Sequence, residues 1–291
     1  MDLRQLRFFA EVARLESFTK AAASLHVAQP AVSIGIRNLE EGLGVALLNR
    51  QGKKVTLTAE GEVFLGHARE ILARMRAAER EMQERRGLEK GEVRVGIPTQ
   101  LGSYYFPRIF VDFKKLYPQL RFSVYEYGTR RIGELLAQGE LELGVIVTQD
   151  APENLEVRPF LQEEMVACVP LGHPFATKAA VRHEEFAREP LVLFEEGYFH
   201  REVIARVSSY AGVSPTITFE TNLIPLLKAL VREGFGITTF LRMVIHGDPD
   251  LAAVRFAPPI FFELGIAWKK NAFLSQANRV FVDFLLDRTK N

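Results

Sequence analysis

Apolar positions recur at helical spacing through the first third of the chain and predict four helices there. The helices are expected over residues 3–14, 18–25, 29–41 and 59–86. Ser17 suits the N-cap of the second helix, and Thr58 suits that of the fourth. The second and third helices are short, and only three residues, 26–28, join them. Two short helices with so tight a connection, the second of them amphipathic, are typical of a helix-turn-helix.

The third helix has one face that its pattern leaves unexplained. Its apolar stripe repeats at i, i+4, i+7 and i+11, at Val32, Ile36, Leu39 and Leu43, and either Gly42 or Gly44 is expected to end the helix. The opposite face should meet water, yet it carries Ile34. Beside the stripe stands Gly35, which costs about 1 kcal/mol relative to alanine in a helix interior. We expect Gly35 where another helix or a DNA backbone approaches closely.

Two short strands are expected after the third helix, over residues 47–50 and 54–57, with a turn at 51–53. Basic side chains gather at the tip of this hairpin: Arg50, Lys53 and Lys54. A protruding basic hairpin beside a helix-turn-helix suits phosphate contacts. A solvated turn is the alternative.

The fourth helix carries a narrow apolar seam. Its members are spaced 4-3-4-3-4: Phe64, Ala68, Ile71, Met75, Ala78 and Met82. At about 1.5 Å per residue the helix is roughly 40 Å long. A seam of this kind needs a partner, and the simplest partner is a second copy of the same helix. The alternative is a helix that packs on its own chain.

Strands and helices alternate beyond a break at residues 87–91. We expect strands at 92–97, 120–126, 142–147, 163–170, 191–194, 216–220, 236–240 and 260–268, and helices at 101–116, 129–138, 199–211, 222–233 and 274–288. This alternation predicts βαβ units and a mostly parallel sheet, hence an α/β fold. Ligands of such sheets bind beyond the carboxyl ends of the strands.

Composition and charge distinguish the N-terminal segment from the rest of the chain. With 291 residues, 47% hydrophobic and 25% charged, the chain is globular and long enough for two or three domains. Residues 1–58 carry eight basic and five acidic side chains, a net charge of +3, whereas the whole chain carries +1. A basic front end on a slightly acidic body suits a polyanion-binding module attached to a second module.

Several classes of protein are disfavoured. The only cysteine, Cys168, cannot form an intramolecular disulfide, and its place in a strand predicts a buried thiol rather than a redox sensor. No apolar run reaches 18 residues and the first residues lack a secretion core, so we expect no membrane span and a cytoplasmic location. Gly234 and Gly236 begin a dinucleotide-like motif, but Thr239 replaces its third glycine. The six histidines lack metal-ligand spacing, so we expect neither a metal nor an enzyme.

Short motifs at fixed spacing point to one family. They are S-F-T-x-A-A from residue 17, Q-P-A-V-S from 29, L-E-x-x-L-G from 39 and L-T-x-x-G from 57. GEVRVGI, FPRIFVDFKKLYPQLRF, ELLAQGELELGV and GHP follow in the body. Over its whole length the chain resembles the LysR-type transcriptional regulators. It departs from their usual pattern at Ala28, where serine or threonine is common, and at Ile34, where a polar or basic residue is common.

The resemblance implies a domain organisation. It comprises a winged helix-turn-helix over residues 1–58, a linker and dimerisation helix over 59–86, a hinge at 87–91 and an effector-binding domain over 92–291. That domain would consist of two α/β subdomains resembling periplasmic solute-binding proteins, with subdomain I at about 92–161 and 266–291 and subdomain II at about 162–265. The implied partners are double-stranded DNA, RNA polymerase and further copies of the chain, as a homodimer and a homotetramer.

The resemblance also carries DNA contacts onto particular residues. The base-reading set is Gln29, Pro30, Ser33, Ile34 and Arg37, and the phosphate-binding set is Ser17, Thr19, Arg50, Lys53 and Lys54. Glutamine can pair with adenine in a bidentate way, arginine with guanine or a phosphate, and an apolar side chain can contact a thymine methyl group. For each residue alone, a solvated surface position is the alternative.

A small-molecule effector, and no other cofactor, is expected between the two subdomains. The candidate residues follow the predicted strands: Pro98, Thr99, Gln100, Gly102, Thr129, Val147, Thr148, Phe194, Phe199, Asn222 and Phe240. The helix start near Thr99 suits a carboxylate, although Thr99 and Thr129 could instead be helix caps. The alternative function is a small-molecule sensor whose N-terminal module mainly oligomerises.

Overall fold

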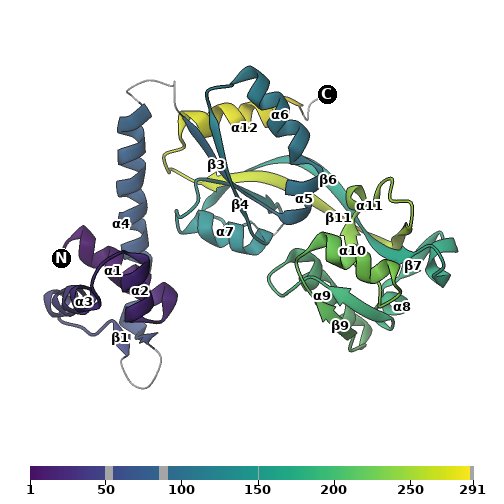
Figure 1. The fold of residues 1–291 in the computed structure, drawn as a ribbon, viewed down its shortest axis with the longest axis horizontal. Helices are drawn as coiled ribbons and strands as arrows, with labels where there is room; N and C mark the ends of the chain where they lie inside the picture. Colours follow the sequence, from purple (N-terminus) through teal and green to yellow (C-terminus); the bar gives the residue numbers. More distant parts are fainter. Residues whose placement is uncertain (50–54, 85–90, 150, 289–291) are drawn as a thin grey trace. The chain divides into compact units, whose positions relative to one another are not determined.

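The computed structural model describes residues 1–49, 55–84, 91–149 and 151–288 (Figure 1). The chain divides into two compact units, Met1–Arg86 with Gln138–Glu140, and Gly87–Ala137 with Leu141–Asn291. Within the described residues no helix combines the length and apolar character that a membrane crossing requires.

The N-terminal unit has the predicted helices. They are α1 (Leu3–Leu15), α2 (Phe18–Ser24), α3 (Gln29–Leu43) and α4 (Ala59–Glu84), with a short antiparallel pair, β1 (Leu48–Asn49) and β2 (Thr56–Leu57), before α4. Asp2 and Gln5 form a capping box at the start of α1. Gly44 adopts a left-handed conformation, with φ of +72°, and ends α3. Thr58 caps α4 as predicted, since its Oγ1 accepts a 2.9 Å hydrogen bond from the backbone N–H of Gly61.

The apolar stripe of α3 is shorter than predicted. Val32, Ile36 and Leu39 are fully buried, but Leu43 is 36% exposed. The core that α1 and α4 provide extends only as far as Leu39, because α3 continues for one further turn before Gly44.

The seam predicted along α4 is divided in the structure. Ala68 is fully buried and Phe64 half-buried, because the first half of α4 completes the core of its own helix-turn-helix unit with Leu65 and Leu72. Further along, Met75 is half-buried, whereas Ile71, Ala78 and Met82 are exposed. Packing on its own chain therefore accounts for the start of the seam, and only its later part is available to a partner.

A seven-stranded sheet organises the second unit, in the order β10-β6-β11-β5-β3-β4, with β7 beside β11. Its strands are β3 (Glu92–Ile97), β4 (Arg121–Glu126), β5 (Leu143–Val147), β6 (Leu155–Pro170), β7 (Ala180–Arg182), β10 (Thr238–Leu241) and β11 (Leu251–Lys269). A separate parallel pair consists of β8 (Pro190–Leu193) and β9 (Thr216–Glu220).

The prediction of a mostly parallel sheet is wrong at the centre of this unit. β3 pairs in parallel with β4 and β5, but β11 is antiparallel to β5 and β6, and β10 is antiparallel to β6. β6 and β11 are long strands that pair with each other and extend between the two halves of the unit (Figure 1). One carries the chain out of the first half and the other carries it back, so they must run in opposite directions.

Helices cover both faces of the first half. They are α5 (Thr99–Tyr104), α6 (Phe106–Leu116), α7 (Thr129–Ala137) and α12 (Gln276–Arg288), with α6 and α12 on the face opposite α7 (Figure 1). Rings from α6 and α12 pack together, as Phe113 meets Phe281 edge-on at 5.2 Å. The predicted helix at 101–116 is two helices, because Pro107 lacks the N–H that would continue α5 and instead stands in the first turn of α6.

The second half holds α8 (His183–Ala187), α9 (Phe199–Ala211), α10 (Ile224–Arg232), α11 (Arg242–Ile245) and a 3-10 turn at Pro174–Thr177. The pattern predicted α9 to the residue and α10 approximately. It missed α8, α11, β7 and the 3-10 turn, because elements of three to five residues are too short to show a period.

Candidate nucleic-acid interface and effector pocket

The exposed face of α3 presents most of the predicted base-reading residues. Gln29, Pro30 and Arg37 are exposed, Ile34 is 53% exposed, and Ser33 is half-buried. The side chain of Gln29 lies along the helix, where its Nε2 donates a 2.9 Å hydrogen bond to Ser33 Oγ. Ala28 stands at the N-cap without a side-chain hydrogen bond. The first backbone N–H groups of α3 therefore have no side-chain cap from this residue.

Gly35 is explained by the fold of its own unit. A Cβ atom at this position would stand 2.7 Å from the ring of Phe8, on α1. Phe8 is buried, and the guanidinium of Arg4 lies 5.2 Å from the centre of its ring. The predicted close approach is therefore that of a helix, and it sets how α3 lies across α1.

The predicted phosphate-binding residues divide into two groups. Ser17 caps α2 by accepting a 3.3 Å hydrogen bond from the backbone N–H of Lys20, and Thr19 is exposed in the first turn of that helix. The hydroxyl hydrogen of Ser17 can still donate to a phosphate oxygen, since its oxygen acts as the acceptor. Arg50, Lys53 and Lys54, at the tip of the predicted hairpin, lie outside the described residues.

A hollow in the N-terminal unit was not predicted. Its lining is mostly apolar and comes from the end of α3, the segment before β1 and the start of α4: Leu43, Val45, Leu47, Ala59, Glu60, Val63, Phe64 and His67. Val63 is 67% exposed and Val45 is 43% exposed. The alternation of apolar and polar residues gave no signal for this surface, because its members come from three different segments.

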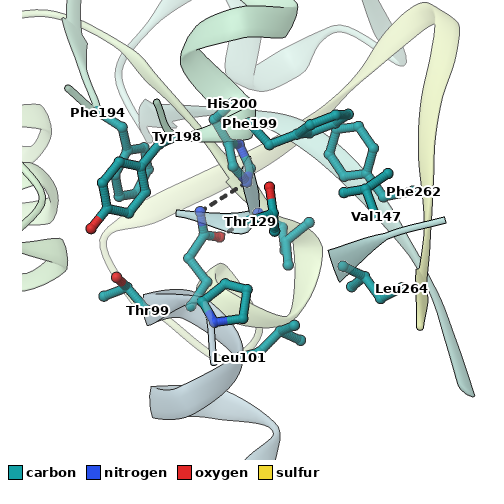
Figure 2. Close-up of a pocket in the computed structure, with 13 residues that line it drawn as sticks. Thr99, Leu101, Thr129, Val147, Phe194, Tyr198, Phe199, His200, Phe262 and Leu264 are labelled. Atoms are coloured by element: carbon teal, nitrogen blue, oxygen red, sulfur yellow. Dashed lines mark hydrogen bonds between the residues drawn. The ribbon is translucent and has the colours of Figure 1, made fainter. Parts of the chain in front are cut away.

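The second unit contains a pocket between α5 and the start of α9 (Figure 2). Seven of the predicted effector residues line it: Pro98, Thr99, Gln100, Thr129, Val147, Phe194 and Phe199. Six further lining residues were missed: Leu101, Tyr198, His200, Leu241, Phe262 and Leu264. The cavity measures about 40 Å³. This volume has room for roughly three water molecules, so a metabolite requires the walls to move apart.

Four predicted effector residues do not line this pocket. Gly102 packs beside Ile97, and Thr148 donates a 2.7 Å hydrogen bond to Glu263. Asn222 is held by Glu195, because its Nδ2 donates a 2.6 Å hydrogen bond to the carboxylate of Glu195. Phe240 is fully buried in the core, because side chains alternate along β10 and its neighbour Leu241 lines the pocket instead.

Gln100 and His200 join the two walls of the pocket through a buried hydrogen-bonded relay. Gln100 Oε1 accepts a 2.8 Å hydrogen bond from the backbone N–H of Leu241, and Gln100 Nε2 lies 2.9 Å from His200 Nε2 (Figure 2). An amide nitrogen can only donate, so His200 Nε2 accepts. The ring proton is then on Nδ1, which lies 3.3 Å from Thr239 Oγ1. Burial lowers the pKa of His200 to about 3, so this imidazole is neutral.

Acidic groups lie at the rim of the pocket near Thr99. The hydroxyl of Thr99 donates a 2.7 Å hydrogen bond to Glu126. Burial is the largest cause that raises the pKa of Tyr198, and the negative charges of Glu126 and Glu195 raise it further. A hydrogen bond with Thr99 acts in the opposite direction and lowers this pKa. Two carboxylates, those of Glu126 and Glu195, therefore lie beside this part of the pocket.

Gly128 and Gly197 bring the two walls into backbone contact beside the pocket. A Cβ on Gly128 would stand 2.3 Å from the carbonyl oxygen of Gly197 and 3.4 Å from Tyr198 Cα. Gly128 immediately precedes α7, and Gly197 lies just before α9. This position therefore excludes any side chain while the pocket is closed.

Cys168 is fully buried in β6, as predicted, and burial raises the pKa of its thiol to about 12. A thiol with this pKa is protonated at neutral pH and reacts slowly. The buried cysteine offers no peroxide-sensing chemistry.

Comparison with known proteins assigns both units. Residues 3–62 match the bacterial regulatory helix-turn-helix protein model of the lysR family, and residues 86–290 match the LysR substrate binding domain. The HTH-type transcriptional regulator YwbI of Bacillus subtilis is 34% identical, over 97% of this chain and 95% of the relative.

Solved structures agree with this assignment. A full-length OxyR variant from Pseudomonas aeruginosa is 25% identical with a TM-score of 0.67, covering 100% of this chain and 95% of its own. Full-length CbnR, solved with its target DNA, shares the fold at 23% identity and a TM-score of 0.64, covering 99% of this chain and 100% of its own. Because the helix-turn-helix model covers the N-terminal unit, a module that mainly oligomerises is not supported. The chain belongs to the LysR family of bacterial regulators and is a DNA-binding transcriptional regulator with an effector-binding domain, not an enzyme.

Proposed function

We propose that this regulator reads its operator with the exposed face of α3 and responds to a small molecule bound between α5 and α9. The observation that carries the second part is the Gln100–His200 relay. It is a buried polar bridge between two walls with a cavity beside it. A ligand that binds among these groups alters the hydrogen bonds that hold the walls together.

The DNA contacts divide by chemistry. On α3, Gln29, Ile34 and Arg37 are the candidates for base contacts, with Ser33 and Pro30 beside them. Ser17 and Thr19, at the start of α2, and the basic hairpin residues Arg50, Lys53 and Lys54 are proposed to hold phosphates. The CbnR complex supports this use of the fold, since that relative was solved with its target DNA.

The proposed assembly is a homodimer, and a homotetramer formed from two dimers. Ile71 and Met82 expose apolar surface along α4, at 38% and 54%. These residues, with Ala78, form the part of the predicted seam that its own chain leaves uncovered. Paired recognition helices would then read half-sites about one helical turn apart.

The proposed response is a population shift. An effector that binds the widened form of the pocket more tightly than the closed form favours the widened form, by no more than that difference in affinity. A change in the spacing of the DNA-binding units would then alter DNA bending and contact with RNA polymerase. The domain limits at residues 58, 86 and 91, and the subdomain limits near 162 and 265, belong to this proposal. So does a cytoplasmic location, where the operator is accessible.

Fluorescence anisotropy with the intergenic region upstream of the chain's own gene tests the DNA-binding part. The full-length protein should form a specific complex whose affinity falls steeply with salt, and Arg37→Ala should weaken it. Asn38→Ala, at the adjacent exposed position on α3, serves as the comparison for any general effect on the helix. Equal binding to the upstream region and to unrelated DNA would refute operator recognition by this unit.

A further inference from the structure

The lining of the effector pocket has a chemical character that none of the comparisons assigns. Most of its surface is hydrocarbon, from Pro98, Leu101, Val147, Phe194, Phe199, Leu241, Phe262 and Leu264. Among the described residues that line it, none is Lys or Arg, and none is Asp or Glu. His200, its single titratable imidazole, is neutral. A charged ligand would therefore lose its hydration without gaining an ion pair inside.

Three arginines directly follow lining residues in the sequence, and each is paired with a carboxylate. Arg242, after Leu241, lies 2.7 Å from Glu164 and does not line the pocket. Arg130 follows the lining residue Thr129, but its side chain is 70% exposed and lies 3.6 Å from Glu134 and 3.5 Å from Glu202. Arg201 follows His200 and pairs with Glu220 at 3.2 Å. Neither Arg130 nor Arg201 lines the pocket.

Acidic groups at the rim oppose a negative ligand further. Glu126 accepts from Thr99, and Glu195 is held by Asn222 at 2.6 Å, so both carboxylates are fixed near the entrance. An approaching carboxylate would meet repulsion at the rim and no counter-charge inside. The helix start at Thr99 does not offset this, because α5 has only six residues. The carboxylate expected from the sequence is therefore disfavoured by the pocket itself.

One buried polar side chain, Gln100, keeps a hydrogen-bond donor to spare, and this donor points to what the pocket accepts. Gln100 is 5% exposed, and its amide nitrogen carries two N–H groups. His200 takes one of them, and the described residues offer no acceptor for the other. Thr129 lines the same space and offers a hydroxyl group there. A carbonyl oxygen on a ligand would satisfy the amide, and the hydroxyl can donate or accept beside it.

We propose that the effector is an uncharged small molecule with an apolar, ring-sized body and a carbonyl or carboxamide end that accepts from Gln100. The proposal rests on the effector pocket of the proposed function and names its ligand class. The rings of Phe199 and Phe262 provide the apolar wall (Figure 2). They pack edge to face, with their centres 4.3 Å apart. The body enters as the walls at Gly128 and Gly197 part, since the closed cavity is too small for it.

Three probes of matched shape test the charge preference: benzamide, benzoate and benzylammonium, at pH 7.5 with the full-length protein. Thermal shift and calorimetric titration should show benzamide binding at least tenfold tighter than the other two. Gln100→Met keeps the length of the side chain and removes its hydrogen bonds, so benzamide affinity should fall about tenfold. Gln119→Met, at an exposed position on the loop after α6, is the matched control and should leave the affinity unchanged.

Each outcome bears on either the ligand class or the pocket. Tighter binding of benzoate or benzylammonium that Gln100→Met weakens would overturn the uncharged class and leave the pocket as the effector site. Benzamide binding that survives Gln100→Met unchanged would overturn both the contact and the assignment of the pocket. No binding of benzamide at concentrations up to its solubility would refute the proposed ligand class and leave the proposed effector site standing.

Discussion

Gly128→Ala should wedge the effector pocket open. The added Cβ would stand 2.3 Å from the carbonyl oxygen of Gly197 and 3.1 Å from its carbonyl carbon. Non-bonded contacts between such atoms are normally more than 3 Å, so the two backbone segments must separate by about 1 Å. The obstacle is backbone, which cannot swing aside as the end of a long side chain does.

The separation has a calculable cost. Overpacking of this kind destabilises a protein by about 1–3 kcal/mol, and the second unit is large enough that each kcal/mol lowers its Tm by roughly 2–4 °C. We therefore expect a Tm lower by about 2–12 °C. Because Gly197 lies just before α9, the displacement should also lengthen the 2.9 Å hydrogen bond between Gln100 and His200.

Differential scanning fluorimetry of the full-length chain measures the loss of stability, and hydrogen exchange of the segment 197–201 measures the opening. Gly133→Ala is the matched control on α7, where the new Cβ would meet only Pro152 Cδ at 3.9 Å. Alanine is preferred there by about 0.5–1 kcal/mol, so this variant should be as stable as the wild type or more so. A Gly128→Ala protein with the wild-type Tm and unchanged exchange at 197–201 would refute the backbone contact.

Three further predictions follow from burial. Ile34→Arg changes a side chain that is 53% exposed, so stability should move by less than about 0.5 kcal/mol while the preferred operator sequence changes. Binding-site selection measures this preference, with Val111→Arg as the exposed control, and an unaltered preference would contradict a reading role. His200 has a folded-state pKa of about 3, below its ordinary value, so the unfolded chain takes up a proton first as pH falls. Its contribution to stability, present above pH 6.5, should be lost toward pH 3 at about 1.4 kcal/mol per unit. His200→Gln should remove this component and the exposed His246→Gln should not; identical acid profiles for His200→Gln and wild type would exclude it. Native Cys168 should resist iodoacetamide until the chain is unfolded in urea, and equal labelling of native and unfolded protein would contradict its burial.

Local periodicity predicts the elements of this chain well where an element is long and has one buried face. The strand Glu92–Ile97 and the helix Phe199–Ala211 match their predictions to the residue, because the apolar pattern lies within each element and Gly212 ends the helix. Strand direction is a different kind of information. β6 and β11 look like ordinary buried strands in sequence, and only their long-range pairing makes the centre of the sheet antiparallel.

The effector pocket follows the same division. Thr99, Thr129 and Val147 could be predicted because each lies at the carboxyl end of a strand or just after it. The partners of Gln100 could not be predicted in this way. Its amide oxygen accepts from Leu241, which is 141 positions away, and its amide nitrogen meets His200, which is 100 positions away. A buried polar relay of this kind has no local signature, since none of its members is unusual until the chain has folded.

Two adjacent residues of α3 show how the structure separates packing from recognition. Ile34 and Gly35 both break the pattern of an amphipathic helix, one by exposing an apolar side chain and the other by omitting a side chain. The ring of Phe8 accounts for Gly35, because any Cβ there would overlap it. Within the described chain no contact buries Ile34 fully, and the residue remains 53% exposed. The proposed contact with DNA would cover that surface. The same reasoning applies to the second N–H of Gln100, a donor that the fold buries without an acceptor. At both positions the deviation that folding leaves unexplained is the one that the proposals assign to a partner, DNA at α3 and a small molecule at α5.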